Sequence, residues 1–132
     1  MTAPANARPD RIVVVDDDAR IRDLLRRYLT QEGFDVLLAE DGKALNRLLT
    51  RENIDMIVLD LMLPGEDGLS LTRWVKAHWP VPVLMLSARG EEMDRVIGLE
   101  VVQANEYVTK PFTRQHLLTA VHRLLGVPVP EA

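Results

Sequence analysis

Two apolar runs of this chain end on acidic residues, and they constrain its fold more than any other feature. Val13-Val14-Val15 leads into Asp16-Asp17-Asp18, and Met56–Leu59 leads into Asp60. Short apolar runs rich in β-branched residues are typical of buried parallel strands, whereas carboxylates avoid burial unless they are paired or bind a metal. In an open α/β sheet the carboxyl ends of the strands form the ligand crevice. The runs therefore predict one anionic pocket that contains Asp16, Asp17 and Asp60.

Such a pocket favours a divalent cation. Two carboxylates about 4 Å apart repel each other by roughly 4 kcal/mol at an effective dielectric constant of about 20, and hard divalent cations prefer oxygen ligands. We expect Asp17 and Asp60 to hold the cation, with Asp16 acting through water.

The composition is that of one soluble domain. The chain has 132 residues, 47% of them apolar, and a net charge of −4 with no cysteine. The absence of cysteine excludes disulfides and thiolate metal sites. Scattered basic residues argue against direct nucleic-acid binding. Because the start of the chain lacks a signal-peptide core and no apolar stretch reaches membrane-spanning length, we expect a cytoplasmic protein without a membrane contact.

Apolar periodicity predicts five strands that alternate with five helices. We expect a flexible lead over residues 1–10, one domain over residues 11–125, and a linker start or C-terminal tail over residues 126–132. The strands are expected near 11–15, 36–38, 56–59, 83–86 and 107–108. Short connections between alternating strands and helices predict an α/β fold with a doubly wound parallel sheet covered on both faces.

Two further strand ends carry groups that suit phosphoryl chemistry. Ser87 ends the fourth predicted strand, and Lys110 follows the fifth. A carboxylate oxygen of Asp60 could attack a phosphoryl donor to give an acyl phosphate. The Ser87 hydroxyl and the Lys110 ammonium could then bind the phosphoryl oxygens as charge develops.

The motifs that carry these groups resemble the receiver, or phospho-acceptor, domain of two-component response regulators. The resemblance rests on Val-Val-Asp-Asp-Asp at 14–18, Leu-Asp-Leu-Met-Leu-Pro-Gly at 59–65 and Lys-Pro-Phe at 110–112. The runs at 60–70 and 90–100 are similar to the OmpR-like subgroup, in which the receiver precedes a winged-helix DNA-binding domain. The resemblance implies a flavodoxin-like fold with strand order 2-1-3-4-5.

The resemblance also implies a role for each residue of the site. Asp60 corresponds to the phosphorylated aspartate, and Asp16 and Asp17 to the acidic pair that binds Mg2+. Ser87 and Lys110 correspond to the switch hydroxyl and the phosphate-pairing lysine. Two further positions match as well: the Met62 backbone carbonyl as a metal ligand, and Tyr107 as the aromatic residue that turns inward on activation. The Lys110–Pro111 bond would be cis.

The implied function is that of a signalling module rather than a conventional enzyme. A sensor histidine kinase would phosphorylate Asp60 in a Mg2+-dependent reaction and so change the surface formed by residues 87–112. That change would control dimerisation and, through a DNA-binding domain outside this chain, transcription. One alternative is a phosphorylation-independent interaction or dimerisation module with an altered 98–122 face. Another is a metal-dependent phosphohydrolase, although Met62 stands where such enzymes usually place a second acid.

Simpler roles also apply to several residues. Asp18 is favoured as the N-cap of the first helix, and Tyr107 could be a packing aromatic. We expect Trp74 and Trp79 to pack around the third helix. The three histidines are expected on solvated helical surface: His78, His116 and His122.

The chain departs from its family between residues 98 and 122. The segment 98–107 is one residue longer than in typical members and lacks their second glycine. Asn105 and Glu106 replace paired aspartates, while His116 and Ala120 replace an acidic residue and an arginine. Those charges form a two-fold interface in the family, so we expect an altered or weak dimer through this face.

Overall fold

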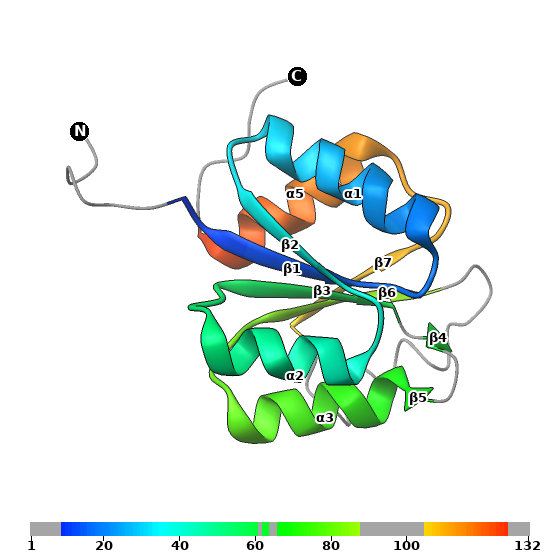
Figure 1. The fold of residues 1–132 in the computed structure, drawn as a ribbon. Coiled ribbons are helices and arrows are strands. Elements are labelled where there is room, and N and C mark those ends of the chain that lie inside the picture. Colours follow the sequence, from blue (N-terminus) through cyan, green and yellow to red (C-terminus); the bar gives the residue numbers. More distant parts are fainter. Residues whose placement is uncertain (1–8, 61, 64–65, 88–104, 127–132) are drawn as a thin grey trace.

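The central sheet has five parallel strands in the order β2-β1-β3-β6-β7 (Figure 1). The computed structural model describes residues 9–60, 62–63, 66–87 and 105–126. The sheet strands are β1 (Arg11–Val15), β2 (Asp35–Ala39), β3 (Met56–Asp60), β6 (Val83–Ser87) and β7 (Glu106–Thr109). This order is the predicted 2-1-3-4-5, so the flavodoxin-like fold class is confirmed.

Helices cover both faces of the sheet. The described part of the chain holds four of them: α1 (Ala19–Gln31), α2 (Gly42–Arg51), α3 (Gly68–His78) and α5 (Arg114–Leu125). Figure 1 shows α1 and α5 on one face and α2 and α3 on the other. One of the five predicted helices, between the fourth and fifth strands, lies outside the described residues.

Each face of the sheet has its own hydrophobic core, because successive residues of a strand point to opposite sides. In β1, Ile12 and Val14 pack with Leu25 and Leu29 of α1 and with apolar residues of α5. Val13 and Val15 pack instead with α2 and α3 residues. The three central strands β1, β3 and β6 are thus buried on both sides, as their uninterrupted apolar character predicts. Trp74 and Trp79 contact the second core, which confirms their expected packing role.

Local signals define where the helices begin and end. The Asp18 side chain accepts from the Arg20 N–H and caps α1, and the Asp41 side chain caps α2 by accepting from the Ala44 N–H. Gly33 follows α1 with φ +90, a left-handed conformation that glycine adopts at little cost, and it turns the chain into β2. A short antiparallel ribbon follows β3, in which β4 (Met62–Leu63) pairs with β5 (Glu66–Asp67).

The expectation for His122 is wrong, whereas His78 and His116 are exposed as expected. His122 is only 7% exposed, and its ring lies 5.4 Å from the Phe34 ring. The cause is helical spacing: residue 122 follows the buried Leu118 by one turn and so faces the sheet. His122 Nε2 also lies 3.5 Å from Oε1 of Glu32, the C-cap residue of α1.

Candidate phosphorylation and metal site

Three carboxylates gather at the carboxyl ends of β1 and β3. Asp16 and Asp17 directly follow β1, and Asp60 is the last residue of β3. One carboxylate oxygen from each of these residues lies within 4.8 Å of the other two. Asp16 is fully buried and Asp60 is 5% exposed, whereas Asp17 is exposed. The pairing of β1 with β3 produces this cluster, because parallel neighbours end at the same edge.

Lys110 supplies the positive charge that this cluster needs. It follows β7, and its Nζ lies 3.4 Å from Asp16 Oδ2 and 3.4 Å from Asp60 Oδ1. The lysine is 27% exposed and reaches two nearly buried carboxylates that would otherwise repel each other. The peptide bond between Lys110 and Pro111 is cis, as the resemblance implies.

Every polar group of Asp16 has a partner. Its Oδ1 accepts from the Asp18 N–H at 2.9 Å, and its Oδ2 faces Lys110. Its backbone N–H donates to the Ala39 carbonyl at 3.2 Å, and its own carbonyl accepts from Arg22 Nη1 at 2.6 Å. Full pairing explains how a carboxylate can remain at a completely buried position.

Asp18 has a different environment from the two aspartates before it. The Arg20 backbone N–H donates to the Asp18 carboxylate and, with the Arg20 side chain, holds the pKa of Asp18 below its ordinary value. Asp18 is not part of the carboxylate cluster found among the described residues. The division of the three aspartates into a site pair and a helix cap therefore agrees with the geometry.

The other predicted site residues are placed by their strands. Ser87 is the last residue of β6 and pairs with Thr109, the residue before Lys110. Asp60 pairs with Leu86, so Ser87 lies one residue beyond the level of Asp60 on the neighbouring strand. Tyr107 is half-buried on β7, and Met62 begins β4 two residues after Asp60. The backbone thus brings Ser87 to the edge of the sheet at which Asp60 lies, whereas Tyr107 lies within β7 and Met62 in a separate short ribbon.

Sequence reasoning missed Arg22, whose guanidinium binds the Asp16 carbonyl. A signal was present, since helical side chains point back toward the helix N-terminus. Arg22 lies in the first turn after the Asp18 cap, so its side chain is directed toward the residues that precede α1.

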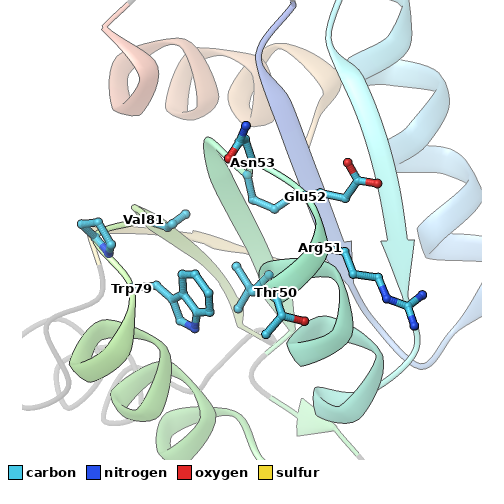
Figure 2. A pocket seen from close by; sticks show the side chains of 9 residues that line it. Thr50, Arg51, Glu52, Asn53, Trp79 and Val81 are labelled. Atoms are coloured by element: carbon cyan, nitrogen blue, oxygen red, sulfur yellow. The ribbon is translucent and has the colours of Figure 1, made fainter.

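A pocket at the opposite edge of the sheet contains none of the predicted site residues (Figure 2). Its volume is about 370 Å³, and it is lined by residues 49–54 and 79–81. These segments precede β3 and β6, so the pocket lies at the amino ends of the strands. Figure 2 shows Trp79 and Thr50 among the residues that line this pocket, with the Arg51 side chain directed away from Trp79. The acidic cluster is therefore the better candidate site.

The chain is similar to known proteins over most of its length. Residues 12–122 match the family model "Response regulator receiver domain". Protein PetR of Rhodobacter capsulatus is 45% identical over 127 residues, covering 96% of this chain and 53% of PetR. The transcriptional regulatory protein GltR of Pseudomonas aeruginosa is 44% identical over 124 residues, covering 92% of this chain and 50% of GltR. The chain thus spans about half the length of these two relatives.

The fold is also similar to solved structures. The receiver domain of the TMAO respiratory system response regulator TorR has a TM-score of 0.85 and 36% sequence identity, covering 89% of this chain and 98% of that one. Among the described residues no helix is both long and apolar enough to cross a membrane.

Proposed function

Because this chain belongs to the response regulator receiver domain family, we propose that it receives a phosphoryl group on Asp60 from a sensor histidine kinase. As a receiver it is a signalling domain of a two-component system rather than a conventional enzyme. One observation carries the assignment of Asp60. Its nearly buried carboxylate ends β3 within the three-carboxylate cluster and lies 3.4 Å from the Lys110 ammonium.

The donor set of the cluster fits Mg2+. Three carboxylates within 4.8 Å of one another offer the hard oxygen ligands that this cation prefers. Asp17 and Asp60 would hold it, with Asp16 acting through water and the Met62 carbonyl as a further ligand. When bound, the cation neutralises part of the negative charge that Asp60 and the phosphoryl group bring together.

The chemical step uses residues from this edge of the sheet and a phosphoryl group supplied by the kinase. A carboxylate oxygen of Asp60 attacks the phosphorus of a phosphohistidine, the P–N bond breaks, and its electron pair stays with the imidazole. The Lys110 ammonium and the Ser87 hydroxyl bind the phosphoryl oxygens as the acyl phosphate forms. Lys110 already faces Asp60, so little rearrangement of that side chain is required.

The acyl phosphate then acts as a switch. Its negative charge attracts the Ser87 hydroxyl and the Lys110 ammonium. Tyr107 then turns inward, and the surface of residues 87–112 changes. In a cytoplasmic OmpR-like regulator this surface would control dimerisation and transcription through a DNA-binding domain outside the chain. GltR is named a transcriptional regulatory protein, and the chain matches half of the length of GltR. This name supports a role of the chain in the control of transcription.

A second candidate is a phosphorylation-independent interaction module. It is favoured by the in-chain contacts of Asn105 and Glu106, two positions that depart from the family. Lys76 Nζ donates to Asn105 Oδ1 at 2.8 Å, and Arg123 Nη1 donates to Glu106 Oε1 at 2.6 Å. These contacts alter the 98–122 face. They leave the acidic cluster of Asp16, Asp17 and Asp60 complete, so phosphorylation remains the better proposal.

Acetyl phosphate labelling tests the proposal. The wild-type chain is incubated with acetyl phosphate in Mg2+ or in excess chelator, and its intact mass is measured. We expect the mass of one phosphoryl group to appear in Mg2+ and to be largely lost in chelator. Absence of labelling in Mg2+ would favour the interaction module instead.

A further inference from the structure

Arg22 links the start of α1 to Asp16, the buried residue that precedes the exposed Asp17. Its backbone N–H donates to the Asp18 carbonyl at 3.0 Å as the first turn of the helix forms. Its half-buried side chain donates from Nη1 to the Asp16 carbonyl at 2.6 Å. Arg22 therefore closes a ring of contacts around residues 16–18, which carry both members of the acidic pair.

The contact is made to the main chain and not to a carboxylate. Within the described part of the chain Arg22 takes part in no ion pair, although Glu40 lines the same hollow of about 360 Å³ beside it. Both carboxylate oxygens of Asp16 keep their own partners, the Asp18 N–H and Lys110. A guanidinium in this position can hold the backbone without occupying an oxygen that a cation would use.

We propose that Arg22 is a positioning residue of the cation site: by holding the Asp16 carbonyl it fixes the orientation in which Asp16 and Asp17 meet a divalent cation. This inference rests on the proposed Mg2+-dependent function and deepens it. Groups that orient metal ligands from outside the ligand shell commonly change metal affinity by tenfold or more when removed.

A positioning role and a purely electrostatic role of Arg22 predict opposite changes in cation affinity when Arg22 is replaced. If Arg22 acted only as a positive charge near three carboxylates, its removal would strengthen cation binding, because like charges repel. If it acts by positioning, its removal weakens binding even though a repulsive charge is lost. The sign of the change therefore separates the two accounts.

The experiment measures Mg2+ affinity of the unphosphorylated chain by titration calorimetry. Arg22→Gln removes both the charge and the reach to the carbonyl, whereas Arg22→Lys keeps the charge and one flexible donor. Arg27→Gln is the matched control, since Arg27 lies on the same helix, is exposed and pairs only weakly with Asp23 at 3.7 Å. We expect a dissociation constant about tenfold higher in Arg22→Gln, an intermediate value in Arg22→Lys, and the wild-type value in Arg27→Gln.

A second measurement does not depend on the metal. Asp17 contributes the N–H of the peptide group whose carbonyl Arg22 binds, so its amide ¹⁵N resonance reports this hydrogen bond in metal-free protein. We expect that resonance to move in Arg22→Gln and to stay in place in Arg27→Gln, with similar thermal unfolding midpoints for the two variants. Poor folding of Arg22→Gln would leave Arg22→Lys to carry the same comparison.

Unchanged or tighter Mg2+ binding in Arg22→Gln would overturn the positioning role, as would an unmoved Asp17 amide. If the wild-type chain bound no Mg2+ at all, the proposed function would fail on that result. The amide measurement would then decide separately whether Arg22 holds the Asp16 carbonyl.

Discussion

At the residue scale, three successive aspartates have three different environments. Asp16 is fully buried with all its polar groups paired, Asp17 is exposed at the cluster, and Asp18 caps α1. The division between the pair and the cap was predictable, because a cap must immediately precede a helical pattern. The contacts of Arg22 and the position of Lys110 between two carboxylates were not, since they depend on side-chain geometry across the sheet edge.

The cap of α1 predicts a pH dependence. The Arg20 N–H holds the pKa of Asp18 below its ordinary value of 3.8, so the ionised form is stabilised by folding. This contribution is present above the unfolded pKa and is lost as pH falls through the lower folded pKa. Asp18→Asn keeps a cap acceptor but does not titrate.

We therefore expect the wild type to be more stable than Asp18→Asn at about pH 7, with the difference shrinking toward about pH 3. Urea unfolding of both proteins across this range measures it. A constant difference at every pH would contradict the assigned role of Asp18.

At the element scale, one residue, Asn105, attaches the start of β7 to its neighbours. Asn105 Oδ1 accepts from the Val83 N–H at 2.9 Å and from Lys76 Nζ at 2.8 Å, and the Asn105 N–H donates to the Val83 carbonyl at 3.0 Å. Asn105 thus joins β6, β7 and the last turn of α3. A departure of this position from the family pattern was predicted from the sequence, but its contacts inside the chain were not.

Asn105→Ala removes the acceptor of two hydrogen bonds and leaves the Val83 N–H without that partner. We expect a loss of about 1–2 kcal/mol in the free energy of unfolding, measured with urea. Asn105→Asp is the matched control, because a carboxylate keeps the acceptor and strengthens the contact with Lys76. Equal destabilisation by both substitutions would show that the acceptor does not matter.

Element boundaries show which sequence signals are strong. β1 was predicted with its observed limits because its apolar run is bounded by polar residues on both sides. β3 extends one residue further, to include Asp60 itself, since pairing with Leu86 continues past the apolar run. The ribbon of β4 and β5 was missed because two-residue strands carry no periodic pattern.

At the scale of the whole molecule, the order of the strands was predictable, but which helix residues face the core was not always predictable. The alternation of strands and helices, together with the family motifs, led to the observed sheet. The burial of His122 against Phe34 escaped prediction, because histidine suits both a surface and a half-polar core. The predicted fourth helix and residues 98–104 of the unusual segment lie outside the described residues.

Dimerisation also depends on the whole molecule, because it requires charged groups that are free to pair with a second chain. Glu106 and Arg123 pair within the chain at 2.6 Å, and Asn105 is occupied by Lys76. Charges already paired internally contribute less to an interface. We expect the acetyl-phosphate-treated chain to sediment mainly as a monomer at micromolar concentration, with untreated protein as the reference. A tight two-fold dimer with inter-subunit salt bridges through this face would contradict the prediction.

The account as a whole depends on Asp60 as the phosphoryl acceptor. The most direct test is intact-mass measurement after acetyl phosphate and Mg2+ treatment of the wild type, Asp60→Ala, and the control Asp18→Asn, whose aspartate lies outside the cluster. We predict one added phosphoryl group in the wild type and in Asp18→Asn, and none in Asp60→Ala. Equal labelling of Asp60→Ala and the wild type would contradict the account.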